Sequence, residues 1–176
     1  MIRRLRPRRA LGAKLRYGVA LLWLCAASAS AESALPTPKD KVRIEAVVGG
    51  LDQPWSLAFL PDGSYLVTER GGRLLRFANG RRAAVAGVPQ VYARGQGGLL
   101  DVVAARDFAV SREVFLSYAK PMRGGGGTAL AAARLSDDGG ALENLRVLFE
   151  MRHGESGGRH FGSRIVEADD GALFLS

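Results

Sequence analysis

From residue 55 to the last residue, short apolar runs alternate with turn signals rich in glycine, proline, asparagine and aspartate. The runs have strand lengths of roughly four to eight residues, and no helical period longer than two turns appears after residue 41. Pro61-Asp62-Gly63 and Asn79-Gly80 carry the residue types that tight turns and hairpins require. The pattern therefore predicts an all-β fold.

The predicted strands fall into groups of four. The first group covers residues 55–60, 64–69, 73–77 and 82–86, and the second covers 99–104, 113–118, 128–135 and 145–151. A third group begins with residues 163–167 and 172–176. Between the strands we expect a turn region at residues 105–112 and a mobile loop at Gly124–Gly127.

Four short strands repeated every roughly 40–50 residues are typical of the blades of a β-propeller. The groups begin at residues 55, 99 and 163, which gives about two and a half blades. Because two and a half blades cannot close a ring, we expect this sequence to be a truncated part of a longer propeller. A small β-sandwich that uses all the strands is the alternative.

The N-terminal segment has a different composition. Residues 1–16 hold seven of the 25 basic residues, and the uncharged run at residues 17–31 ends in Ala29-Ser30-Ala31. This order predicts a signal peptide over residues 1–31 and a periplasmic or secreted protein. The alternative is a membrane anchor, but the run is shorter than the roughly 20 residues that a spanning helix needs. We therefore expect no stable membrane insertion after cleavage.

The same segment accounts for the net charge of +8, because the rest of the chain has 18 basic and 17 acidic residues. Charge therefore gives no support to nucleic-acid binding. Cys25, the only cysteine, lies in the predicted signal peptide, so the mature chain would have neither a disulfide nor a thiolate metal site. Residues 32–41 contain two prolines and are predicted to be a flexible lead-in to the propeller domain, residues 42–176, which begins with a strand at 42–48.

Three polar residues, Asp52, Gln96 and His160, each precede the opening strand of a predicted blade by three residues. In a propeller the opening strands line the central channel, so the loops before them are expected to converge at its mouth. Glycines beside Gln96 and near His160 are expected to allow close approach of a flat ligand. Each residue also has a simpler interpretation, as a turn aspartate, a turn glutamine or a solvated histidine.

Other polar residues give weaker signals. His153 has no matching partner and is interpreted as a surface residue, while Asp137 and Asp138 fit a hairpin tip better than a calcium site. The sequence contains no dinucleotide fingerprint, phosphate loop, zinc pair or nucleophile-elbow motif.

The same residues carry a family resemblance over residues 42–176. Four segments in order resemble the soluble quinoprotein glucose/sorbosone dehydrogenase family, and within it the periplasmic aldose sugar dehydrogenases. They are LDQPWSLAFLPDG at residues 51–63, GQGGLLD at 95–101, Asp107-Phe108, and HFGSRIV at 160–166.

The resemblance implies a six-bladed β-propeller that binds pyrroloquinoline quinone (PQQ) and calcium at the channel mouth and oxidises aldose sugars to lactones. It implies that His160 is the general base and that Gln96 binds both the cofactor and the sugar. Asp52 is a further substrate-binding candidate because of its position before the first opening strand. Arg159 stands where some relatives have an acidic residue. The ligands of the quinone carboxylates and of calcium are expected beyond residue 176, so no metal ligand is assigned and this chain alone is expected to be inactive. The resemblance identifies neither the preferred sugar nor the electron acceptor.

Two other functions stay open. The first is a secreted propeller that binds a sugar or a protein partner without turnover. The second is a lactone- or ester-hydrolysing propeller, which is disfavoured because it would need several carboxylates around the channel and only Asp52 occupies such a position.

Overall fold

A computed structural model of the chain describes residues 33–36 and 41–176. Contacts divide the chain into two units, with the boundary between Val47 and Val48. In the first unit, strand β1 (Ser33–Pro36) pairs antiparallel with β2 (Lys41–Ile44). This pairing falls partly within the predicted flexible lead-in at 32–41, which stays a prediction. The strand predicted at 42–48 ends earlier, at Ile44, and the predicted signal peptide lies outside the described residues.

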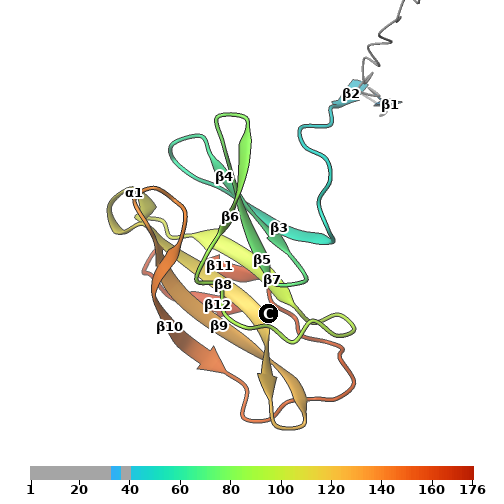
Figure 1. Cartoon of the computed structure of the whole chain (residues 1–176), viewed down its shortest axis with the longest axis vertical. Coiled ribbons are helices and arrows are strands. Elements are labelled where there is room, and N and C mark those ends of the chain that lie inside the picture. The colour runs from blue at the N-terminus through green and yellow to red at the C-terminus, as the bar shows by residue number, and fades with distance from the viewer. Residues whose placement is uncertain (1–32, 37–40) are drawn as a thin grey trace, which may run out of the picture. The chain divides into compact units, whose positions relative to one another are not determined.

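The second unit consists of antiparallel sheets in chain order (Figure 1). The first sheet contains β3 (Pro54–Phe59), β4 (Tyr65–Glu69), β5 (Arg73–Ala78) and β6 (Arg81–Val85). The second contains β7 (Leu99–Ala104), β8 (Glu113–Met122), β9 (Gly125–Leu135) and β10 (Leu142–Glu150), with the one-turn helix α1 (Phe108–Ser111) between β7 and β8. A hairpin of β11 (Ile165–Glu167) and β12 (Leu173–Leu175) follows. The predicted all-β fold of about two and a half four-stranded blades is confirmed.

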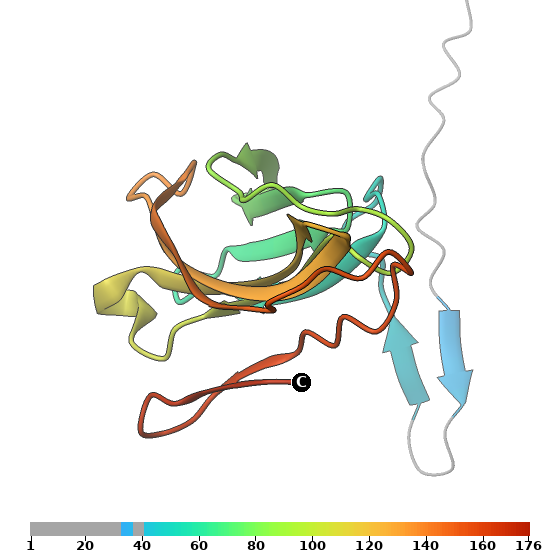
Figure 2. The same ribbon diagram turned by 90° about the horizontal axis from the view of Figure 1, so that it is seen from below.

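The second sheet lies between the first sheet and the β11–β12 hairpin (Figure 2). Alternate residues of its strands face opposite sides, as strand geometry requires. One side contributes Leu99, Val102 and Leu116 to a core shared with Leu66 and Leu74 of the first sheet. The other side contributes Phe115, Leu130 and Ala132 to a second core that includes Ile165 of the hairpin. Because both faces of this sheet are buried, β9 is rich in alanine, with Ala129, Ala131, Ala132 and Ala133 all fully buried.

The turn at Pro61-Asp62-Gly63 has the chemistry that the sequence indicates. Gly63 adopts a positive φ of 78°, and the Asp62 carboxylate accepts hydrogen bonds from the hydroxyl and the N–H of Ser64. These bonds, with Arg76 beside them, hold the pKa of Asp62 below its usual value.

The glycine run was predicted as a mobile loop, and that prediction is wrong. Gly125, Gly126 and Gly127 belong to β9 and pair with Met122, Pro121 and Lys120 of β8. Gly126 and Glu155 exchange two backbone hydrogen bonds of 3.2 and 2.8 Å, so a later loop packs against this strand. A Cβ at Gly125 would lie 2.2 Å from the Glu155 carbonyl oxygen, which explains why glycine is needed in a regular strand here.

The opening strands β3, β7 and β11 are neighbours, since β7 contacts both of the others. The loops that precede them are residues 48–53, 86–98 and 151–164. No helix within residues 33–36 and 41–176 has both the length and the apolar character needed to cross a bilayer.

Candidate active site

Gln96 and His160 lie in contact, although 64 positions separate them. The backbone N–H of His160 donates a hydrogen bond of 2.9 Å to Oε1 of Gln96. The backbone N–H of Gln96 in turn donates to the Gly158 carbonyl at 2.8 Å, so the second and third loops are joined twice. Both residues are exposed. The predicted proximity of these two residues is confirmed, while their roles stay predictions.

The orientation of the Gln96 amide follows from this contact. A backbone N–H can only donate, so the amide must present its oxygen to His160 and direct its NH₂ group elsewhere. Among the described residues, no protein acceptor binds that NH₂ group. Gln96 therefore offers two donors, and the adjacent His160 offers an exposed imidazole.

The glycines around Gln96 allow neighbouring backbone to approach closely. A Cβ at Gly95 would lie 2.3 Å from the Gly158 carbonyl oxygen, and one at Gly98 would lie 2.0 Å from the Arg70 carbonyl oxygen. Gly98 also has a φ of 144°, which other residues rarely adopt. The expectation that the glycines beside Gln96 allow close approach of a flat ligand stays a prediction.

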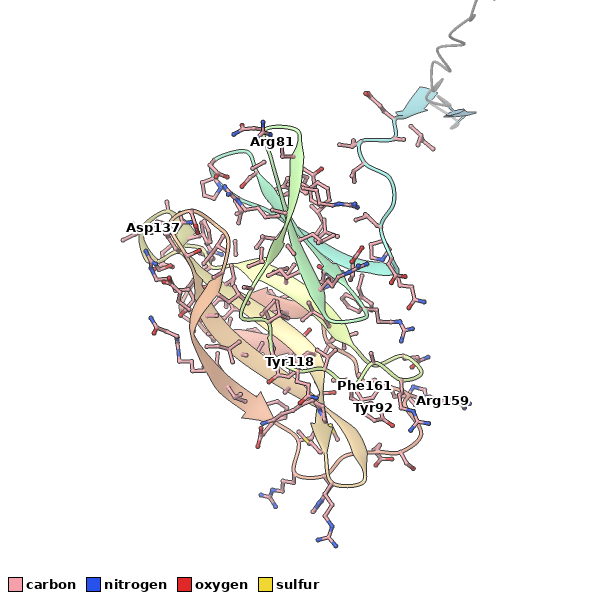
Figure 3. All side chains as sticks on the ribbon, viewed as in Figure 1. Arg81, Tyr92, Tyr118, Asp137, Arg159 and Phe161 are labelled. Carbon is pink, nitrogen blue, oxygen red and sulfur yellow. The ribbon has the colours of Figure 1, made fainter. Side chains whose placement is uncertain are left out.

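Phe161 anchors the loop that carries His160. Its ring is buried in a small apolar cluster with Leu100, Ala119 and Tyr92, and its carbonyl accepts a hydrogen bond of 2.7 Å from Thr128 Oγ1. Tyr92, Arg159 and Phe161 gather at one end of the sheets, whereas Arg81 and Asp137 lie at the other (Figure 3). The buried Phe161 thus holds the loop in place, while Arg159 and His160 beside it in sequence are exposed.

Asp52 is not brought into contact with Gln96 or His160. Its carboxylate lies 3.6 Å from the Arg73 guanidinium and its backbone N–H donates to Glu69 Oε1 at 2.7 Å. The neighbouring Gln53 connects this loop to the loop around Gln96 instead. Its Oε1 accepts a 2.7 Å hydrogen bond from Nε of Arg70, which also binds the loop before β7. Asp52 as a substrate-binding residue stays a prediction without a contact to support it.

Arg70 is a site residue that sequence reasoning missed. One terminal nitrogen of its guanidinium donates to the carbonyls of Gly95 and Gly97, at 2.6 and 3.0 Å, on either side of Gln96. The sequence places Arg70 before Gly71-Gly72, where it resembles an ordinary turn residue. Only the spatial meeting of the loops reveals its contacts.

Asp101 is also central to the structure. Its fully buried carboxylate accepts hydrogen bonds from Ser56 Oγ at 2.5 Å, from the N–H of Ile165 at 2.8 Å and from Arg164 at 3.1 Å. These donors belong to the first blade and to the half-blade, so a single side chain in the second blade joins all three. The Arg164 guanidinium also lies 5.7 Å from the centre of the Trp55 ring, within cation–π range.

Other candidate residues lie away from this end. Within the part of the chain that the structure describes, no group of three or more His, Cys, Asp or Glu side chains is arranged to hold a metal ion. Asp137 is paired with Arg134 and Arg112, and Asp138 accepts hydrogen bonds from the Ser136 hydroxyl and the Gly140 N–H. These bonds lower the pKa of Asp138.

Residues 51–176 match the family of glucose and sorbosone dehydrogenases. The chain belongs to this family. The prediction from the four sequence segments is thereby confirmed, and the match includes both Gln96 and His160.

Individual relatives agree with the family assignment. Aldose sugar dehydrogenase YliI of Escherichia coli (strain K12) is 45% identical over 148 residues, which is 82% of this chain and 40% of that protein. A crystal structure of glucose dehydrogenase aligns with a TM-score of 0.69 at 50% sequence identity. The alignment covers 72% of this chain and 38% of the glucose dehydrogenase chain. The PQQ-bound aldose sugar dehydrogenase of Streptomyces coelicolor has a TM-score of 0.63 at 26% identity and covers 82% of this chain and 40% of its own. The chain thus spans about two fifths of the length of these relatives.

Proposed function

We propose that the protein containing this chain is a PQQ-dependent dehydrogenase that oxidises aldose sugars at the anomeric carbon to lactones. The observation that carries the proposal is the contact between Gln96 Oε1 and the His160 N–H, which puts a histidine and an amide donor side by side. Membership of the glucose and sorbosone dehydrogenase family and the likeness to a PQQ-bound aldose sugar dehydrogenase support it.

The residues present fit part of a quinone site. The exposed Gln96 NH₂ group suits a carbonyl or hydroxyl oxygen, and the exposed imidazole of His160 suits a proton acceptor. Bound PQQ would supply the two-electron chemistry by accepting a hydride. We propose that calcium and the cations that hold the quinone carboxylates belong to the rest of the protein, because the described residues form no metal-ligand group.

The role proposed for His160 is general-base catalysis. An unprotonated ring nitrogen takes the proton of the anomeric hydroxyl while the hydrogen on the same carbon leaves as hydride, so the sugar loses two electrons and becomes the lactone. Histidine suits this step because its side chain changes protonation near neutral pH. Gln96 would orient the sugar and the quinone, since it can donate two hydrogen bonds beside the base.

This chain alone would be inactive, because it spans about two fifths of the length of its relatives. The rest of the proposal concerns its surroundings: a periplasmic or secreted location, a soluble sugar as substrate, and an electron acceptor still to be identified.

Dye reduction with an aldose, PQQ and calcium tests the proposal on the full-length protein. We expect His160→Ala to lower kcat by about 10²–10⁴-fold, the usual contribution of a general base. His153→Ala, a change at an exposed histidine in the same loop, serves as the control and should leave kcat unchanged.

Three results would contradict the proposal: no dye reduction by the full-length protein, an unchanged rate in His160→Ala, or activity from this chain alone. A spectrum of the reconstituted protein adds a direct check against a propeller that only binds, since sugar should reduce the quinone in a dehydrogenase.

A further inference from the structure

Arg70 connects all three loops at the candidate site, directly or through one residue. Its backbone N–H and its Nε both donate to Gln53, in the loop before β3, at 3.0 and 2.7 Å. Its terminal nitrogen binds the Gly95 and Gly97 carbonyls in the loop before β7. Gln96, between those glycines, then binds Gly158 and His160 in the loop before β11.

Within the described residues, the Arg70 guanidinium has no carboxylate partner. Its acceptors are one side-chain amide and two backbone carbonyls, and all of them belong to loops at the site. A planar guanidinium holds several acceptors in fixed directions, which a lysine ammonium on a flexible stem cannot reproduce. The arginine is therefore suited to fixing the shape of the loop around Gln96.

The backbone around Arg70 strengthens this constraint. Its carbonyl accepts the Leu99 N–H at 3.1 Å, so the arginine is bound to the start of β7 as well. Gly98 permits this approach, because a Cβ there would lie 2.0 Å from the same carbonyl oxygen. Gln96 is thus held in two ways. Arg70 binds the carbonyls of Gly95 and Gly97 on either side of it, and its own N–H donates to the Gly158 carbonyl.

We propose that Arg70 is a positioning residue: it fixes the Gly95–Gly97 backbone so that Gln96 holds the His160 backbone and points its NH₂ group into the site. This inference rests on the proposed function for its effect on turnover. The loop geometry itself is independent of turnover, because the hydrogen bonds exist without any ligand.

Arg76 provides a matched control. Its guanidinium also joins the first two sheets, binding Ser64 and Asp62 in the first and the Asp138 carbonyl in the second, at 3.3, 2.8 and 3.0 Å. Asp138 follows Asp137, which lies at the end of the sheets opposite Arg159 and Phe161 (Figure 3). Replacing Arg76 therefore removes similar contacts between sheets without touching the loops at the site.

The experiment compares Arg70→Gln, Arg70→Lys and Arg76→Gln in the full-length protein. Without ligand, we expect amide exchange at His160 and Gln96 to accelerate by about tenfold in Arg70→Gln. The released Gly95–Gly97 segment would no longer hold Gln96 Oε1 against the His160 N–H, or the Gln96 N–H against the Gly158 carbonyl. With sugar, PQQ and calcium, kcat/KM should fall by about 10- to 100-fold, since small displacements of positioning groups cost this much. Arg70→Lys should lie between Arg70→Gln and the wild type in both amide exchange and kcat/KM. Arg76→Gln should change neither quantity, even if its Tm falls as much as that of Arg70→Gln.

Unchanged exchange at His160 in Arg70→Gln, or an equal loss of kcat/KM in Arg76→Gln, would overturn the inference. If Arg70→Gln does not fold, Gln53→Ala removes only the acceptor of Nε and should shift the same amide signals in the same direction; no shift there would also overturn it. Should the wild-type protein reduce no dye while the exchange results hold, the proposed function fails and the positioning inference stands.

Discussion

At the scale of single residues, the buried carboxylate of Asp101 joins all three blades by direct hydrogen bonds. Ser56, Ile165 and Arg164 all donate to it, and the N–H of Val102 adds a fourth hydrogen bond of 3.0 Å. A carboxylate surrounded by donors is well solvated by the protein, and an amide of the same shape is not, because its NH₂ group would face donors.

We therefore expect Asp101→Asn to lower the free energy of unfolding by about 1–3 kcal/mol, the usual cost of leaving buried donors unsatisfied. Urea unfolding of the full-length protein measures this. Asp170→Asn is the control, since the Asp170 carboxylate accepts a single backbone N–H, from Ala172, at an exposed turn. Equal effects of the two changes would show that the contacts of Asp101 with the neighbouring blades contribute little.

Single residues also show how far the sequence could predict the site. Gln96 and His160 were predictable, because each stands at the same place before an opening strand and the propeller pattern brings such loops together. Arg70 and Gln53 were not, because an arginine at a strand end and a glutamine before proline have no spacing signal of their own. Asp52 has the right position in sequence, but its carboxylate lies beside Arg73 instead.

At the scale of elements, strands with regular apolar alternation were predicted closely, and β7 was predicted at its observed bounds. The extension of β9 over Gly125–Gly127 was missed because glycine carries no hydrophobic period, and the partner extension of β8 to Met122 was missed with it. The strand continues there because these glycines pair with β8 and the loop around Glu155 packs on them, which is tertiary information. Gly125 is the position where this packing is tightest.

Gly125→Ala should separate the loop around Glu155 from β9. The added Cβ would lie 2.2 Å from the Glu155 carbonyl oxygen, and alanine at a φ of 145° costs about 1–3 kcal/mol in backbone strain. We expect the amide of Glu155, which donates to Gly126, to exchange about tenfold faster or more. Gly157→Ala is the matched control in the same loop, because nothing lies within 4 Å of its Cβ position. An equal change in both variants would mean that any alanine in this region loosens the loop.

At the scale of the whole molecule, the outer face of the first sheet is apolar. Two rows of paired residues cross β3, β4 and β5 on that face: Leu57, Val67 and Leu75, and Phe59, Tyr65 and Phe77. The rings of Tyr65 and Phe77 stack with centroids 4.9 Å apart. The opposite face of the same sheet packs on the second sheet, as Ala58, Leu66 and Leu74 show.

The two faces differ in what covers them. Leu57 is 48% exposed and Phe59 is 74% exposed, both on β3. Val67, Leu75 and Phe77 of the same face are buried, and Leu51 packs against them. In a closed propeller a neighbouring blade covers such a face, and the proposed longer protein would supply that blade. An apolar face of paired aromatic and aliphatic side chains otherwise promotes association.

We therefore expect this chain, produced without residues 1–31, to self-associate and to bind a hydrophobic dye, and the full-length protein to stay monodisperse. Sedimentation velocity and dye fluorescence measure the difference. Leu57→Ser with Phe59→Ser should reduce association, because it makes the exposed β3 part of this face polar. Val110→Ser is the control, since Val110 is 89% exposed on α1, outside these rows. If the chain sediments as a monomer, or if Val110→Ser reduces association equally, this face needs no covering blade and the argument for ring closure through it fails.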